Sequence, residues 1–144
     1  MLGSQKEFSM AFEYQHEQAG TTGMVVRLPA GAAVLQNAPV WIDTTGKVSP
    51  CVGAKKIFGV TLEAASGVDV VIPVQLASSG SVWLADVTGT PVVGVAYGTT
   101  ASTGINLLVS DVTNCHFRCV DVASAGTGKA KVIPISNYVA ATTG

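Results

Sequence analysis

Charged side chains are scarce in this chain of 144 residues. They account for 12% of the residues, against 48% that are hydrophobic, whereas about a quarter of the residues of an ordinary soluble domain are charged. Much of the surface must therefore be neutral, and a neutral surface rich in Ser, Thr, Gly and Ala protects a free monomer poorly against association. The composition predicts an oligomer in which neighbouring subunits cover part of this surface.

Concentrated positive charge and long apolar runs are missing as well. The net charge is −1, and the eight basic residues are scattered apart from the pair Lys55 and Lys56, so the chain offers no basic stripe for a nucleic-acid backbone. No run approaches the roughly 20 apolar residues of a transmembrane helix, and residues 1–18 lack the apolar centre of a signal peptide. We therefore predict no nucleic-acid partner, no membrane partner, and synthesis in a cytoplasm.

The chain has only two histidines and three cysteines, so it offers few ligands for a metal site. Cys115, His116 and Cys119 are residue types that bind zinc, but a structural zinc site needs a further ligand pair, and the remaining candidates, Cys51 and His16, are isolated from each other. We predict no metal and no other cofactor. An odd number of cysteines in a chain without a secretion signal instead predicts free, mostly buried thiols.

The residue order around the paired cysteines predicts which way they point. Neighbouring side chains of a strand point to opposite faces, so Cys115, Phe117 and Cys119 would share the core face as small apolar residues. His116 would then lie on the strand exterior, together with Arg118.

Motifs for catalysis are lacking too. The chain has no G-x-S-x-G nucleophile motif and no Gly-rich phosphate loop ending in GK[ST], and its carboxylates stand mainly at the ends of apolar runs, where Asp commonly caps turns. Glu63 follows the run FGVTL and precedes AAS, which predicts a turn-capping carboxylate or an ion pair with Lys55 or Lys56. We therefore predict that the protein is not an enzyme.

The abundant residues are valine, with 22 copies, and threonine, with 14, in short runs punctuated by glycine. This pattern predicts an all-β fold, either a small β-barrel or a β-tulip-like or sandwich domain. Proline cannot donate to a strand ladder, so the strands that contain VIPV and VIPI should lie at a sheet edge or carry a bulge. In the first of these strands, alternation assigns the core face to Val70, Ile72, Val74 and Leu76. The predicted strands are Met24–Leu28, Val40–Asp43, Phe58–Leu62, Val70–Leu76, Ser81–Val87, Val92–Ala96, Phe117–Val122 and Lys131–Ile135.

Residues 1–20 are more polar than the rest and place Phe8, Met10, Phe12 and Tyr14 at alternate positions. This alternation predicts an extended N-terminal arm whose four apolar side chains contact a partner. An N-terminal strand of the same barrel, or a frayed tail, is the alternative. Residues 21–144 are predicted to form a single β domain.

A weak internal repeat relates residues 39–74 to residues 91–135 and suggests a domain of two similar halves. The second half is enlarged at residues 99–115. The matched anchors are Pro39-Val40 and Gly46 with Pro91-Val92 and Gly98, Phe58 and Gly67 with Phe117 and Gly126, and VIPV with VIPI.

The stretch KKIFGVTLEAASGVDVVIPVQLASSGSVWLADV, residues 55–87, has the form of an FGV run, an acid, small residues with glycine, and a valine-rich strand. Together with VRLPAGAAVLQNAPVWIDTTGKVSPC upstream, it resembles the small capsid decoration proteins, also called cement or head-stabilising proteins, of tailed bacteriophages. The resemblance covers about Val25 to Val87. The longer second half, TTASTGINLLVSDVTNCHFRC, departs from the family pattern, and this leaves open which face binds the capsid.

The resemblance implies a structural virion protein without an active site. Members of that family are compact β-barrel or β-tulip-like domains, usually homotrimers, which sit on the capsid exterior at three-fold or quasi-three-fold positions and bridge capsomers of the major capsid protein.

Two alternative functions stay open. One is another virion β module, from a tail or spike or a glycan binder, with Trp41 and Trp83 stacking on sugar instead of lying in the core or a subunit interface. The other is a small hydrolase that uses Glu63 or His116.

Overall fold

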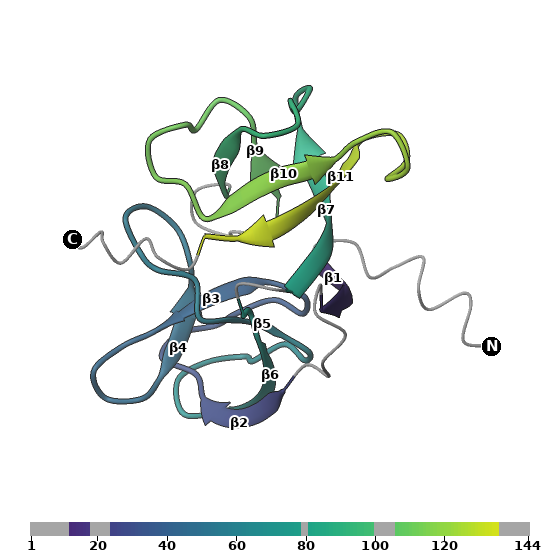
Figure 1. Cartoon of the computed structure of the whole chain (residues 1–144). Coiled ribbons are helices and arrows are strands. Elements are labelled where there is room, and N and C mark those ends of the chain that lie inside the picture. Colours follow the sequence, from purple (N-terminus) through teal and green to yellow (C-terminus); the bar gives the residue numbers. More distant parts are fainter. Residues whose placement is uncertain (1–11, 18–23, 79–80, 100–105, 136–144) are drawn as a thin grey trace.

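The computed structural model describes residues 12–17, 24–78, 81–99 and 106–135 and confirms the all-β class. Its strands form two sheets, which are seen one above the other in Figure 1. The part of the chain described here forms no helix that would be long and apolar enough to span a bilayer. The strands are β1 (Phe12–Glu17), β2 (Val25–Pro29), β3 (Pro39–Ile42), β4 (Val48–Pro50), β5 (Gly59–Thr61), β6 (Val71–Leu76), β7 (Ser81–Thr88), β8 (Ala96–Thr99), β9 (Leu107–Leu108), β10 (Phe117–Asp121) and β11 (Lys129–Pro134).

The upper sheet in Figure 1 has the order β1-β7-β11-β10-β8-β9 and curls back on itself. Its last strand, β9, pairs with β8 and also runs parallel to the end of β7, where Val87 is opposite Leu107. The strands from β7 round to β9 therefore make a nearly closed ring, and β1 is added to β7 outside it. Such closure removes the exposed edges that an open sheet would leave.

The lower sheet has the order β2-β6-β5-β3-β4 and is antiparallel throughout. Alternation along β6 places Ile72 and Val74 in the core, as predicted, and leaves Val71 exposed. Val70, predicted for the same face, precedes the strand and is exposed as well. A tight turn follows β3 at TTGK, a glycine-containing break between apolar runs. Gly46 is in the left-handed region at φ 84°, and its N–H donates to the carbonyl of Asp43 at 3.0 Å.

Each sheet has its own apolar cluster. The cluster of the upper sheet contains the largest buried side chains, among them Trp83, Phe12 and Phe117. The cluster of the lower sheet consists of smaller aliphatic side chains. The run Phe58-Gly59-Val60 connects the two, because Phe58 packs against the lower cluster whereas Val60 is buried in the upper one.

One predicted strand is misplaced. Residues 92–95, expected to begin a strand, form a turn in which the N–H of Val95 donates to the carbonyl of Val92 at 3.1 Å. Gly94 has φ 94° there, outside the dihedral range of a regular strand, and the strand that follows is β8. The prediction also omitted β4 and β9, which are three and two residues long.

The two prolines in valine-rich strands contradict the expectation of edge strands. β6 lies between β2 and β5, and β11 lies between β7 and β10. Pro73 is tolerated in β6 because β5 ends at Thr61, opposite Val74, so the missing N–H falls beyond the ladder. Pro134 is the last residue of β11, past the pairing of Val132 with β7.

The described part of the N-terminal region is a strand of the same domain, which is the alternative that the sequence left open. β1 pairs antiparallel with β7, with Phe12 opposite Ala85 and Tyr14 opposite Trp83. Phe12 is fully buried in its own chain and stacks on Phe117, with ring centroids 4.7 Å apart. Phe12 is therefore a core residue of its own chain, so a test of arm contacts has to retain β1. Phe8 and Met10, predicted for the same contact, lie outside the described residues.

The last anchors of the internal repeat occupy similar structures in the two halves, whereas the first anchors do not. β5 with β6 and β10 with β11 are both antiparallel hairpins, and VIPV and VIPI lie on their second strands. The earlier anchors differ, since Val40 is buried in β3 and Val92 is 57% exposed in a turn. Gly46 likewise forms a turn, whereas Gly98 lies within β8.

Candidate functional site

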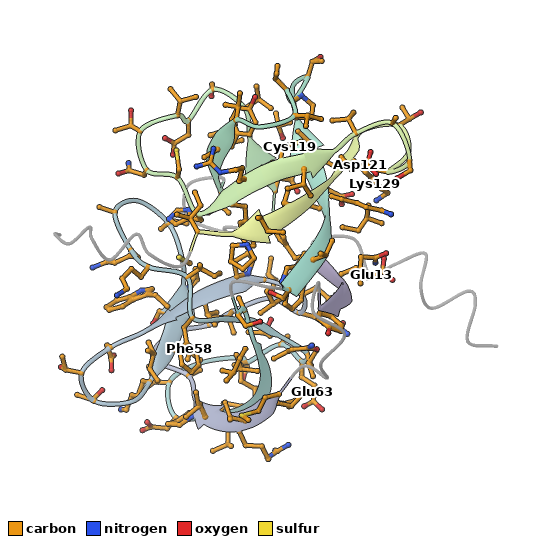
Figure 2. All side chains as sticks on the ribbon, viewed as in Figure 1. Glu13, Phe58, Glu63, Cys119, Asp121 and Lys129 are labelled. Atoms are coloured by element: carbon orange, nitrogen blue, oxygen red, sulfur yellow. The ribbon has the colours of Figure 1, made fainter. Side chains whose placement is uncertain are left out.

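Glu63, the carboxylate singled out in the sequence, lies on the surface in the loop between β5 and β6 (Figure 2). No ion pair joins it to a lysine in the ranges described, where the ion pairs are Lys47 with Asp69 at 2.8 Å and Lys129 with Asp86 at 2.5 Å. The predicted pairing of Glu63 with Lys55 or Lys56 is therefore absent. Glu63 is exposed to solvent and does not line the apolar pocket described below.

Asp43, Asp111 and Asp121 act as turn caps, as predicted. Asp43 Oδ1 accepts hydrogen bonds from the N–H of Thr45 at 2.8 Å and from its hydroxyl at 2.6 Å. The Thr45 hydroxyl and the Lys47 N–H hold the pKa of Asp43 below its ordinary value. Asp121 caps the turn after β10 in the same way by accepting from Ser124, which lowers its pKa. These hydrogen bonds stabilise the loops that contain the carboxylates.

His116 is placed differently from the prediction. It precedes β10 instead of lying inside it, and its side chain is 1% exposed, not on the strand exterior. Its Nε2 lies 2.8 Å from the carbonyl oxygen of Gly53, which belongs to the loop after β4. Burial lowers the pKa of His116. A neutral imidazole enclosed in the protein has no access to a substrate.

The cysteines are free thiols, as predicted, and lie apart from any metal-binding group. Cys51 and Cys119 are buried and Cys115 is half-buried, with its Sγ donating to the carbonyl of Ala96 at 3.4 Å. Within residues 12–17, 24–78, 81–99 and 106–135, no three side chains of His, Cys, Asp or Glu come together as metal ligands would. Burial raises the pKa of Cys51 to about 12, so its thiol is a poor nucleophile.

We expect the native protein to present at most one reactive thiol to DTNB near pH 8. A pKa of about 12 leaves roughly one Cys51 thiol in ten thousand ionised at that pH, and Cys119 is shielded by the same cluster that contains Trp83. Peptide mapping after brief labelling should find the label on Cys115 alone, and all three thiols should react in denaturant. Rapid labelling of native Cys51 would contradict its buried position.

The two tryptophans do not form a shared platform for sugar. Trp83 is in the core, as predicted, where its Nε1 donates to the hydroxyl of Ser81 at 2.8 Å and Tyr14 meets its ring edge-on. Trp41 is half-buried on β3, and the ammonium of Lys55 lies 4.2 Å from its ring centroid. A cation therefore already occupies one face of the partly exposed tryptophan.

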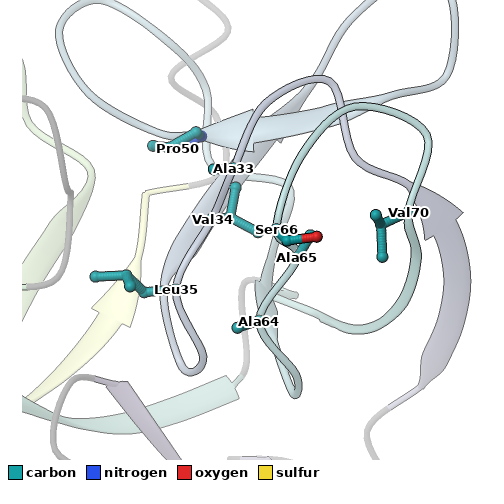
Figure 3. A pocket seen from close by; sticks show the side chains of 8 residues that line it. All are labelled: Ala33, Val34, Leu35, Pro50, Ala64, Ala65, Ser66 and Val70. Atoms are coloured by element: carbon teal, nitrogen blue, oxygen red, sulfur yellow. The ribbon is translucent and has the colours of Figure 1, made fainter.

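An apolar pocket of about 530 Å³ lies between two loops of the lower sheet (Figure 3). Loop 30–38 and loop 62–70 are joined across it by paired backbone hydrogen bonds between Val34 and Ala65, at 3.0 and 2.9 Å. The only polar side chain that lines the pocket is that of Ser66. The lining residues are Ala33, Val34, Leu35, Pro50, Ala64, Ala65, Ser66 and Val70.

Exposed apolar side chains surround the mouth of this pocket. Leu35 on one loop is 48% exposed and Val70 on the other is 37% exposed, and Val68 and Val71 beside Val70 are exposed as well. An apolar concavity with exposed aliphatic residues at its rim is typical of a binding surface. It offers no charge and one hydroxyl, so it can accept an uncharged apolar group and cannot orient a substrate for chemistry.

Sequence reasoning missed the pocket. All but Pro50 and Val70 of its lining residues come from the stretches PAGAAVLQN and LEAASGV, in which alanine and valine suit a tight core as well as an exposed surface. A usable signal was the density of small apolar residues in both inter-strand loops, where turns ordinarily carry polar residues.

Comparison of the sequence with models of known protein families and with curated proteins finds no match. The resemblance to capsid decoration proteins remains a prediction from the quoted residues. These residues, from about Val25 to Val87, span the whole lower sheet, both loops of the apolar pocket and nearly all of β7.

Proposed function

We propose that this protein is a structural virion protein that binds the outside of an assembled phage capsid and stabilises it. In this proposal the protein acts as a homotrimer at three-fold or quasi-three-fold positions and bridges neighbouring capsomers of the major capsid protein. The observation that carries the proposal is the uncharged pocket with exposed Leu35 and Val70 at its rim, within the stretch that resembles decoration proteins. The scarcity of charge supports it, because such a surface suits burial against other subunits.

The mechanism that we propose is additive bonding without catalysis. An apolar side chain of the capsid protein that fills the pocket would contribute about 1.5–3 kcal/mol by burial alone. Three pockets on one trimer act together, because engagement of the first raises the effective concentration of the others. Weak individual contacts would in this way hold adjacent capsomers together against internal pressure or heat.

The arrangement of the candidate catalytic residues favours a structural role over the hydrolase alternative. Glu63 is exposed on a loop and His116 is enclosed in the protein, so the two do not form an acid–base pair. The thiol of Cys51 stays protonated at neutral pH because its pKa is raised to about 12. A Glu63→Gln variant that keeps full capsid binding would agree with this proposal.

The Leu35→Glu variant tests the pocket. A carboxylate at the rim would have to be desolvated against an apolar partner, so we expect affinity for empty phage heads to fall at least about tenfold, or 1.4 kcal/mol. Co-sedimentation of the purified protein with the heads measures this. The matched control is Val92→Glu, because Val92 is also an exposed aliphatic residue, at 57% against 48% for Leu35, but lies in a turn of the other sheet.

The two variants separate failure of the pocket from failure of the whole proposal. If both variants bind the heads as well as the wild type does, the pocket does not contact the capsid. A wild-type protein that is monomeric by analytical ultracentrifugation and leaves the heads undecorated would overturn the proposed function. Binding to sugar instead, abolished by Trp41→Ala, would favour the alternative of a glycan-binding virion module, since Trp41 is the only partly exposed tryptophan.

A further inference from the structure

His116 links the two sheets through its backbone and its side chain. Its backbone belongs to the upper sheet, where its N–H donates to the carbonyl of Tyr97 at 2.9 Å and its carbonyl accepts from the N–H of Ile135 at 3.0 Å. Its Nε2 reaches Gly53 at 2.8 Å in the loop that connects β4 to β5 of the lower sheet. This side chain is therefore a direct polar bond between the layers.

The bond to Gly53 determines the state of the imidazole. A backbone carbonyl only accepts, so Nε2 must carry the hydrogen and Nδ1 must be the bare nitrogen of a neutral ring. Nδ1 is buried and has no hydrogen-bond partner, and it is the one such side-chain nitrogen or oxygen among the residues described. Protonation would add an N–H at Nδ1, which has no hydrogen-bond partner, and a positive charge on the ring, and both are costly in a buried site.

The charged and titratable groups around the ring do not reverse this preference. Desolvation is the largest influence on its pKa and lowers it, whereas the carbonyls of Gly53 and Lys55 and the more distant carboxylate of Asp111 act in the opposite direction and are weaker. The thiol of Cys51 stays neutral and points at the carbonyl of Lys55, 3.6 Å away. The ammonium of Lys55 itself lies over Trp41, on the outside of the same loop.

We propose that His116 is a pH-sensitive latch that holds residues 53–56 against the upper sheet when it is neutral and releases them when it is protonated. Gly53, Ala54, Lys55 and Lys56 are all exposed, whereas Ile57 packs against the upper cluster, so residues 53–56 can move while Ile57 keeps its place in the core. Release breaks the Nε2 bond to Gly53 and lets water reach Nδ1. The consequence is a weaker contact between the two sheets in mild acid.

The direction of the pH dependence follows from the lowered pKa. The unfolded chain takes up a proton on His116 near its ordinary value of 6.5, whereas the folded protein takes it up only at lower pH. The stabilisation is therefore complete above about pH 6.5 and is lost as the pH falls from there through the folded-state pKa. Over that interval the unfolding equilibrium constant rises by up to tenfold per pH unit.

The experiment compares urea unfolding of the wild type, His116→Gln and His16→Gln between about pH 7.5 and pH 5.5, above the range in which carboxylates titrate. Glutamine keeps a donor for the Gly53 carbonyl but does not titrate in this range. We expect the unfolding midpoint of the wild type and of His16→Gln to fall with pH, and that of His116→Gln to stay level. A wild-type midpoint that stays level, or a His116→Gln midpoint that falls in parallel with the wild type, would overturn the latch.

NMR of the wild-type protein gives a second readout that needs no substitution. The ring signals of His116 should titrate below 6.5, and the amide signals of Gly53 to Lys56 and the indole signal of Trp41 should shift with the same midpoint. A ring that titrates at or above 6.5, or loop amides that stay fixed while it titrates, would overturn the proposal even if His116→Gln did not fold.

Discussion

Replacing Trp83 with alanine should lower the free energy of unfolding by about 3–5 kcal/mol. Trp83 is the largest fully buried side chain, and it lies on β7, the strand that pairs with β1, β11 and β9. The substitution leaves a cavity between these strands, removes the edge contact with Tyr14 and leaves the Ser81 hydroxyl without its indole donor. Since the folded state of a domain is more stable than the unfolded state by only about 5–15 kcal/mol, this loss is large.

Urea unfolding followed by circular dichroism measures the effect without dependence on tryptophan fluorescence. The matched control is Trp41→Ala, because Trp41 is half-buried and its described partner is the Lys55 ammonium. A cation–π contact at such a site contributes about 0.5–1 kcal/mol, so this control should lose much less stability than Trp83→Ala. Similar losses in the two variants would show that Trp83 is not the centre of the upper cluster.

Replacing Gly59 with alanine should cost about 1–3 kcal/mol. Gly59 stands in β5 opposite Leu76, where an added Cβ would lie 2.5 Å from the backbone oxygen of Gln75 and 2.6 Å from a methyl carbon of Val74. The backbone oxygen cannot move without separating β5 from β6. The glycine of the FGV run is thus required by the close approach of a neighbouring strand.

Gly67→Ala is the matched control for Gly59→Ala. Gly67 lies eight residues after Gly59 in the same sequence stretch. An added Cβ at Gly67 would meet no atom within 4 Å, and the φ of Gly67 is not in the left-handed region. Alanine restricts the unfolded chain, so this variant should match the wild type or gain up to about 1 kcal/mol. The expectation for Gly59 fails if the two substitutions have equal effects on the urea midpoint.

Local patterns predicted the features that depend on neighbouring residues alone. The turn at Gly46, the capping role of Asp43 and the buried positions of Ile72 and Val74 all follow from turn chemistry and from alternation along a strand. The turn at Gly94 shows the limit of such patterns. The valines around it have high β-propensity and predicted a strand, but Gly94 adopts a left-handed conformation and the chain turns there instead.

Errors arose where a residue's surroundings come from distant parts of the chain. Pro73 lies in an interior strand because its neighbour, β5, is too short to need its N–H. His116 precedes β10 and is enclosed by loop 52–57, so alternation within the strand did not apply to it. The apolar pocket likewise exists because loop 30–38 meets loop 62–70, which are separated by three strands in the sequence.

The sequence by itself determined the all-β class, the free thiols and the turn-capping carboxylates, because composition and short-range spacing are sufficient for these features. Only the tertiary structure decided that β9 closes the ring against β7, that Phe12 is buried in its own chain and that Nδ1 of His116 has no partner. Strand order and the burial of a side chain result from contacts between residues far apart in the chain. The alternation of apolar residues along a strand does not specify which strands pair.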